Sequence, residues 1–483
     1  MMTSWVANAR KLCLAVALSV LATACAQPDA WEGPTGEVQI PQAPIARATD
    51  EILVVDVDQD GAEPIALSAA ASEDPDGEIV EYSWSSGLEE IGDGPEYATE
   101  LPIGVHVFML TVVDDDDLTD FLPIVVRVVP LYTTEPGAPE IVIWGGQEVS
   151  FDLGSSQRWL NIVGNVSDED GVTSLQYQLN DGPVLPASLG PNERRLVRPG
   201  DFNIDLPRAA FRVGRNVVLI EATDSNGLET SAAIVVETLD QPAPELPVRV
   251  DWNELLGEAP ALVDFVDGYW EFDDEATVPF EEAGYDRLLS LGSDEWSEYD
   301  VEVTVAVDDV RPQSAVGPWS ASPAFGVMLR WQGHNNGITP GSQPRQGVYA
   351  GLADEPTPFG GFFLARWQPE SRRFIPQLQN HRGLAVDFAS GDDFEITDRF
   401  TVRFQVQSIV GGSLYRAKIW PAGTPEPSEW GLEHIAGDTD FEPSKGTVLL
   451  IAHELSASFG DVTVSPIAAA DRVDATIEDL TSE

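Results

Sequence analysis

Short runs in which apolar and polar residues alternate recur along this chain, and they constrain its fold more than any other feature. In the clearest run, Tyr299–Val307, Tyr or Val occupies every second position, with Asp300, Glu302 and Thr304 among the residues between. Successive side chains of a strand point to opposite faces, so the run predicts a strand with one buried face. Clusters rich in Gly and Pro, which number 41 and 36, separate such runs. The sequence therefore predicts an all-β, loop-rich protein.

The chain is strongly acidic. Its 483 residues include 81 Asp and Glu against 26 Lys and Arg, which gives a formal net charge of −55. This charge repels phosphate groups and argues against nucleic acid and anionic membrane surfaces as direct partners. Two interpretations of the acidity remain open: a compositional habit suited to a saline medium, or a set of Ca²⁺ sites. The length predicts three or four domains.

The amino terminus has the pattern of an export signal. Two basic residues precede an apolar run, Leu12–Ala22, that is too short to span a bilayer stably. The sequence LATAC that ends at Cys25 resembles the lipobox of bacterial lipoproteins, with its Leu one place early. The resemblance implies a signal peptide over residues 1–24, a membrane anchor at Cys25, and a place in the outer membrane or at the cell surface. An ordinary signal peptide is the alternative. Residues 25–39, rich in Pro and Gly, are predicted to be a tether.

Residues 40–130 contain a first set of strands and turns. The segment Asp74–Gly77, with sequence DPDG, predicts a turn, because Pro presets φ and Gly accepts a positive φ. The stretches Ser72–Trp84 and Pro102–Asp114 resemble the PKD (polycystic-kidney-disease-type) β-sandwich. The resemblance implies a spacer or interaction module that has Trp84 in its core and no catalytic activity.

Residues 136–241, which follow a predicted linker at 133–139, repeat this pattern in a weaker form. The turn at Asp168–Gly171 matches the first DPDG turn, and Val218–Gly227 matches a strand followed by an acidic turn. We predict a second immunoglobulin-like sandwich. Two interpretations of Asp168 and Asp170 remain open: Ca²⁺ ligands, or part of a hairpin turn.

Residues 248–467 form the third and largest predicted domain. Five of its segments resemble, in order, parts of laminin-G and concanavalin-like lectin/glucanase jelly rolls; these are Trp296–Val303, Gly326–Trp331, Lys418–Gly423, Glu426–Trp430 and Phe459–Val464. The resemblance implies two stacked sheets, in a fold that serves both sugar-binding modules and glycosidases. The predicted fold class is therefore all-β, with two Ig-like sandwiches followed by a larger concanavalin-like jelly roll. Residues 468–483 are predicted to be a frayed acidic tail.

Sugar binding needs an aromatic ring for the C–H face of a pyranose and planar polar groups for its hydroxyls. In the predicted strand Phe325–Trp331, the alternation places Arg330 on the wet face and Trp331 in the core. Trp420 shares its parity with Lys418 and is the better platform. The predicted ligand-binding residues are Arg330, Gln332, His334, Arg366, Trp367, Lys418, Trp420 and His453.

A catalytic alternative depends on Glu298, Asp300 and Glu302, which resemble the Glu-x-Asp-x-(x)-Glu motif of retaining laminarinase-type glycosidases. Period-2 geometry places all three carboxylates on one strand face, where two of them would act as nucleophile and acid/base. The position of the motif, early in the domain, favours an outer-sheet strand instead. Asp461, in the last predicted strand, falls where related jelly rolls place a structural Ca²⁺ ligand.

These observations predict a lipid-anchored surface protein whose terminal jelly roll binds a polysaccharide or surface glycan. The two sandwiches would act as spacers, and no cofactor beyond structural Ca²⁺ is expected. A glycoside hydrolase and a purely structural or adhesive envelope protein are the alternatives.

Overall fold

The computed structural model of the chain describes residues 41–49, 51–154, 159–191, 196–255, 263–273, 275–280, 286–310, 323–333, 360–368, 370–380, 385–387, 399–437 and 442–474. The predicted signal peptide, Cys25, the tether and His334 lie outside these ranges. Within them, no helix is long and apolar enough to cross a bilayer.

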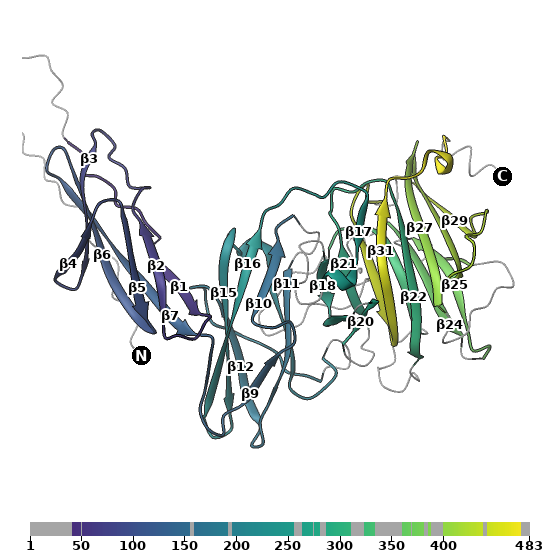
Figure 1. The fold of residues 1–483 in the computed structure, drawn as a ribbon, viewed down its shortest axis with the longest axis horizontal. Helices are drawn as coiled ribbons and strands as arrows, with labels where there is room; N and C mark the ends of the chain where they lie inside the picture. Colours follow the sequence, from purple (N-terminus) through teal and green to yellow (C-terminus); the bar gives the residue numbers. More distant parts are fainter. Residues whose placement is uncertain are drawn as a thin grey trace, which may run out of the picture.

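The first domain is a small β-sandwich, drawn in purple and dark blue in Figure 1. One sheet has the order β1-β7-β6-β3-β4, and the other pairs β2 with β5. Trp84 is fully buried and donates from Nε1 to the Gly94 carbonyl at 2.9 Å, so it is a core residue, as predicted. The strands are β1 (Glu51–Asp56), β2 (Ala62–Ser68), β3 (Ile79–Ser86), β4 (Glu89–Asp93), β5 (Glu96–Pro102), β6 (Gly104–Asp114) and β7 (Thr119–Pro130).

The second domain is also a sandwich. Its larger sheet has the order β10-β16-β15-β12-β13, with β8 added against β16, and its smaller sheet has the order β14-β11-β9. Because β8 pairs with β16, the first residues of the predicted linker are part of this domain. The strands are β8 (Tyr132–Thr134), β9 (Glu140–Ile143), β10 (Glu148–Asp152), β11 (Trp159–Ser167), β12 (Val172–Leu179), β13 (Leu185–Pro186), β14 (Asp201–Pro207), β15 (Gly214–Asp224) and β16 (Glu229–Leu239).

The third domain stacks two large sheets. The eight-stranded sheet has the order β19-β20-β31-β22-β27-β28-β29, with β17 added against β31, and the seven-stranded sheet has the order β18-β21-β30-β23-β24-β25-β26. The strands of the eight-stranded sheet are β17 (Val248–Val250), β19 (Trp270–Phe272), β20 (Ala276–Pro279), β22 (Tyr299–Val310), β27 (Arg399–Ile409), β28 (Gly412–Pro421), β29 (Leu432–Gly437) and β31 (Leu455–Ser465). Those of the other are β18 (Val263–Asp267), β21 (Arg287–Leu291), β23 (Ala324–Trp331), β24 (Gly361–Gln368), β25 (Arg373–Asn380), β26 (Ala385–Asp387) and β30 (Thr447–His453).

Alternation in β22 explains how the two sheets of this domain meet. Tyr299, Val301, Val303, Val305 and Val307 all enter the core between the sheets, as the sequence predicts. The residues of opposite parity therefore point away from that core, on the outer face of the eight-stranded sheet. The predicted fold class is confirmed: the described residues form an all-β chain of two Ig-like sandwiches and a larger jelly roll.

Neighbouring domains contact each other, and the three follow one another along the long axis of the molecule (Figure 1). An apolar cluster joins the first two domains; its buried members are Val55, Val217, Leu219, Ala233 and Val235. Between the second and third domains, Asn161 Nδ2 donates to the carbonyls of Phe265 and Val266 at 2.7 and 2.6 Å. These contacts suit two spacers that hold the jelly roll at one end of the chain.

Candidate functional site

The outer face of the eight-stranded sheet carries charged side chains in rows across neighbouring strands. Glu302 of β22 pairs with Arg403 of β27, which pairs in turn with Lys418 of β28. One row further along lie Asp300, Gln405 and Arg416. Period 2 places the two rows on the same face, since each residue is two positions from its counterpart.

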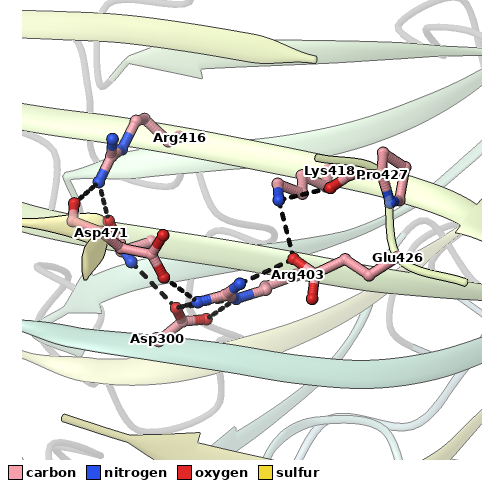
Figure 2. Close-up of polar contacts among 8 residues, drawn as sticks. Asp300, Arg403, Arg416, Lys418, Glu426, Pro427 and Asp471 are labelled. Carbon is pink, nitrogen blue, oxygen red and sulfur yellow. Dashed lines mark hydrogen bonds and ion pairs between the residues drawn. The ribbon is translucent and has the colours of Figure 1, made fainter. Parts of the chain in front are cut away.

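Arg403 is the centre of this face (Figure 2). Its Nε donates to both oxygens of Asp300 at 3.0 and 2.9 Å, and Nη2 donates to Asp300 Oδ2 at 2.5 Å. The same guanidinium donates to Glu426 at 2.7 Å and to Asp471 at 2.7 Å. Burial opposes the charge on Arg403, but these hydrogen bonds outweigh that effect and raise its pKa. Arg403 therefore holds three carboxylates that come from separate parts of the chain.

The loop between β28 and β29 folds back over the sheet and is held there by Lys418. The Lys418 ammonium donates to Glu426 Oε1 at 2.8 Å and to the Pro427 carbonyl at 2.7 Å (Figure 2). This places the ring of Trp430 over three cations, with its centroid 5.1 Å from Arg403 Cζ, 4.8 Å from Arg416 Cζ and 4.7 Å from Lys418 Nζ. A cation over an aromatic ring is attracted by the negative face of the ring. Three cations from one sheet thus fix the orientation of a half-buried tryptophan.

The residues after β31 cover the other half of this face. Arg416 Nη2 donates to the Asp471 carbonyl, and Gln407 both donates to the Val473 carbonyl at 2.6 Å and accepts from its N–H at 3.0 Å. The prediction of a tail frayed from residue 468 is therefore wrong as far as residue 474. The reason is tertiary: this short segment hydrogen-bonds to Arg416 and Gln407 of the eight-stranded sheet. The local sequence does not reveal these contacts.

Two glutamates beside Trp430 have opposite electrostatic environments. Burial, then the neighbouring Glu426, raises the pKa of the Glu302 carboxyl, although Glu302 as a whole is exposed to solvent. Burial also acts to raise the pKa of Glu426, but hydrogen bonds from Lys418 and Arg403 outweigh it and lower that pKa. The uncovered half of the face therefore offers a bound carboxylate and a second, more basic carboxyl next to an aromatic ring.

Arg330 does not lie on this face, or on any wet face. The sequence places it opposite Phe325 on a half-exposed strand, whereas every residue of β23 is buried. Arg330 has φ of 55°, and the pairing with β30 shifts register between Met328 and Trp331. This irregularity moves Trp331 away from the Phe325 core and into a second buried cluster, on the other face of the sheet. Trp331 is a core residue, as predicted, although for a different reason.

The Arg330 side chain is 1% exposed, and its guanidinium makes hydrogen bonds within the third domain. Its guanidinium donates to the Ser297 carbonyl at 2.9 Å, to Ser413 Oγ at 2.6 Å and to Ser408 Oγ at 2.8 Å. It also donates to the Pro443 carbonyl at 3.0 Å. These bonds join β23 to the β27–β28 hairpin, so the expectation that Arg330 is exposed for a ligand is wrong.

The other predicted binding residues are divided between different surfaces. Lys418 and Trp420 share the outer face of the eight-stranded sheet, where both are buried. Trp367 enters the core between the sheets. In the seven-stranded sheet, Ala324 of β23 pairs with Arg366 of β24 on one side and with His453 of β30 on the other. Gln332 donates to the Lys445 carbonyl at 2.9 Å. No single depression that unites all of these side chains is evident among the described residues.

Glu298, Asp300 and Glu302 do point from one side of β22, but each is in a different environment. Glu298 accepts from the Ser408 N–H at 3.1 Å and from Arg472 at 2.9 Å. Asp300 is bound by Arg403, between the other two. Four residues of strand span roughly 13 Å, whereas paired carboxyls of glycosidases lie about 5 to 9.5 Å apart. The arrangement suits binding better than it suits a two-carboxylate mechanism with Glu298 and Glu302.

The residues that could hold a metal ion are not those expected in the third domain. Asp461 accepts from Arg249 at 2.7 Å and from the Trp252 N–H at 3.3 Å, so one of its oxygens is paired with an arginine and the other with a backbone N–H. Among the residues that the structure describes, two groups of three carboxylates, each with ligand atoms within 4.8 Å of one another, lie in the sandwiches. They are Asp56, Asp58 and Glu63 in the first domain, and Asp168, Asp170 and Asp224 in the second.

Sequence reasoning missed several of these residues. Trp430 stands in a Pro- and Glu-containing loop directly after the strand that carries Arg416 and Lys418, and this neighbourhood was a usable signal. The pattern Asp56-x-Asp58-x-Asp60-Gly61 is a recognisable cation-loop motif and was a usable signal for the group in the first domain. Nothing local indicates that Asp471 reaches Arg403, because 68 residues separate them.

A hollow of about 1180 Å³ lies between domains, away from this face. Its lining includes Phe265, Tyr269 and Phe272, whose rings contact one another with centroids 5.1 and 5.9 Å apart. Those rings pack against one another, whereas Trp430 is oriented by cations from the sheet side. The outer face of the eight-stranded sheet is therefore the better candidate site.

No protein-family model matches the chain, and no curated protein matches it in sequence. Among solved structures, it resembles a carbohydrate-binding module of Bacillus subtilis (12% identity, 42% of this chain and 94% of that one, TM-score 0.26). It also resembles the tandem Ig repeats of Dlar (12% identity, 42% and 99%, TM-score 0.16). A third likeness is the SGBP-B protein of the mixed-linkage glucan utilization locus of Bacteroides ovatus (11% identity, 88% and 100%, TM-score 0.16). TM-scores of this size are low, so the function rests on the geometry of the site itself.

Proposed function

We propose that this protein is a lipid-anchored surface protein that binds a polysaccharide or surface glycan on the outer face of the eight-stranded sheet. The observation that carries the proposal is the ring of Trp430, held over three cations beside Glu302 and Glu426. The cations occupy the sheet side of the ring. In this proposal the opposite side of the ring stacks on the apolar C–H face of a sugar.

The polar groups around the ring suit hydroxyl recognition. Binding sites combine an apolar surface with a few fixed polar groups that set orientation. Glu302 and Glu426 offer acceptors, and Arg403 is held rigidly by its three carboxylates. A site whose side chains are already ordered loses less conformational entropy when it binds.

The remaining parts of the proposal come from the amino-terminal sequence and from the domain order. Cys25 follows an export signal and would carry the lipid, and the tether would separate it from the two sandwiches. The sandwiches then act as spacers that present the jelly roll away from the membrane.

Retention on an insoluble polysaccharide, and a glycan array, test this function. Trp430→Ala is expected to weaken retention about five- to thirtyfold, since an aromatic anchor contributes on the order of 1–2 kcal/mol to such contacts. Trp430→Phe keeps a ring and should retain most binding. Phe121→Ala, which removes a 65% exposed aromatic from the first domain, is the matched control and should bind like the unmutated protein.

Unchanged retention by a folded Trp430→Ala protein would refute the assignment of the site. An empty glycan array, combined with a co-purifying protein partner, would favour the structural or adhesive alternative. A glycoside hydrolase that uses Glu302 as its acid remains a second candidate because of the raised pKa of this carboxyl. It predicts that Glu302→Gln abolishes the release of reducing ends from a β-glucan panel, and no release by the unmutated protein excludes it.

A further inference from the structure

Three carboxylates converge at one end of the second domain, far from the proposed glycan site. Asp168 and Asp170 belong to the turn between β11 and β12, and Asp224 is the last residue of β15. One oxygen from each lies within 4.8 Å of the other two. The turns that carry them are tied together, because Ser225 donates from its hydroxyl to the Asp170 carbonyl at 3.0 Å.

Hydrogen bonds within these turns use one oxygen of each carboxylate. Asp168 Oδ1 accepts from the N–H groups of Asp170 and Gly171, at 2.8 and 3.0 Å. Asp170 Oδ2 accepts from Asn226 Nδ2 at 2.7 Å. Asp224 Oδ1 accepts from two N–H groups, those of Asn226 and Leu228, both at 2.8 Å. The second oxygen of each side chain takes part in none of these bonds.

The second oxygen of Asp224 is the strongest indication of a ligand. The side chain is 2% exposed, and Oδ2 is buried with no hydrogen-bond partner. A buried ionised oxygen without a partner is strongly unfavourable unless a cation or a donor meets it. No lysine or arginine of the described residues pairs with Asp168, Asp170 or Asp224, so this part of the chain does not balance their charge.

We propose that these three carboxylates bind a hard divalent cation of the Ca²⁺ class. The ligands are all oxygens, without the His or Cys side chains that softer metals favour. Ca²⁺ binds oxygen at about 2.3–2.6 Å, so two oxygens on one ion lie at most roughly 5 Å apart. The observed spacing of 4.8 Å or less fits this limit. Of the two interpretations of Asp168 and Asp170 from sequence, the turn is present, but it is not a hairpin, because β11 and β12 belong to different sheets. The cation would bind on this turn.

The first domain provides an internal comparison. Asp74, Asp76 and Asp114 occupy corresponding places, and Asp114 Oδ2 is also buried without a partner. However, both oxygens of Asp76 accept from the Gln42 N–H, at 3.1 and 3.3 Å. The three carboxylates are not among the described groups whose ligand atoms lie within 4.8 Å of one another. Asp114 is therefore a matched control position.

Calorimetric titration of the full chain with CaCl2 tests the proposal, in about 0.3 M NaCl to screen the diffuse charge. The unmutated protein should bind with a dissociation constant of about 10⁻⁴–10⁻³ M, as extracellular modules do. Asp224→Asn and Asp170→Ala should each weaken that binding at least about tenfold, because each removes one charged ligand. Asp114→Asn should leave it unchanged, and Asp58→Asn distinguishes it from binding at Asp56, Asp58 and Glu63 in the first domain. Hydrogen exchange in peptides that cover 168–171 and 224–228 should slow with Ca²⁺.

Three results would overturn the proposal: no saturable binding up to about 10 mM, ten times the weakest affinity expected; equal binding by Asp224→Asn and Asp170→Ala; or loss of binding in Asp58→Asn instead. If Asp224→Asn does not fold, Asp170→Ala decides the question, because Asp170 is exposed and its removal leaves the core intact.

Discussion

Two arginines of the third domain, Arg330 and Arg403, differ in burial, in hydrogen-bond partners and in structural role. Arg330 is buried at 1% exposure and bonds mainly to serine hydroxyls and backbone carbonyls, with Glu442 at 3.6 Å. Arg403 lies on an outer face and bonds to three carboxylates. The first holds the two sheets together, whereas the second organises a surface. The difference teaches that an arginine in a strand pattern indicates a polar environment but not an accessible one.

The largest expected effect is a loss of folding stability when Arg330, the buried arginine of the two, is replaced. Arg330→Leu should lower the free energy of unfolding by about 3–5 kcal/mol, because it removes the cation that pairs with buried Glu442 and the donor to several buried oxygen acceptors. Denaturation in guanidinium chloride measures the change. Arg399→Leu is the control: Arg399 and its partner Glu275 are 62% and 67% exposed, and loss of this pair should cost less than about 1 kcal/mol. Similar losses in both variants would contradict a structural role for Arg330.

An intermediate effect is expected at the outer face. Asp300→Asn removes the charge that Arg403 contacts most closely, and it should cost about 1–3 kcal/mol, since Asp300 is 7% exposed. Thermal unfolding followed by circular dichroism measures the loss. The same variant should also weaken glycan retention, because Arg403 would no longer be held below Trp430. A stability loss as large as that of Arg330→Leu would instead mean that the outer face is part of the core structure.

The smallest expected effect is a dependence on pH at Glu302. Its pKa is raised in the folded protein above the usual 4.5, so the folded state binds this proton more tightly than the unfolded state does. The resulting stability is present below pH 4.5 and is lost as the pH rises through the folded pKa. Relative to the unmutated protein, Glu302→Gln should therefore be slightly more stable at pH 7 than it is at pH 4. Paired melting curves at the two pH values measure this, with Glu429→Gln on the nearby loop as the control. A gain in relative stability at pH 4 would reverse the sign and refute it.

The fold was largely predictable from local patterns. The strand Tyr299–Val307 appears as β22 with the predicted inward side chains, and Trp84 is the core residue that the PKD-like pattern implies. These successes have a common cause. Alternation and turn residues act over a few positions, and burial then selects the register.

The candidate site was only partly predictable. The sequence identified Lys418 and the outward carboxylates of β22, because parity alone places them. It could not identify Asp471 as a partner of Arg403, nor foresee that the segment after β31 docks on the sheet. Those contacts join residues that are distant in sequence, and no local period encodes them.

By itself, then, the sequence determined that this chain is a series of β-sandwiches, that it is strongly acidic, and which side chains share a strand face. Only the tertiary structure decided which of those faces are buried. Arg330 is inside because one residue with φ of 55° breaks the alternation and because another sheet supplies its acceptors. Trp430 lies over the site because a loop is drawn back onto Lys418. The physical reason is that periodicity fixes direction along one strand, whereas exposure depends on what the rest of the chain packs against it.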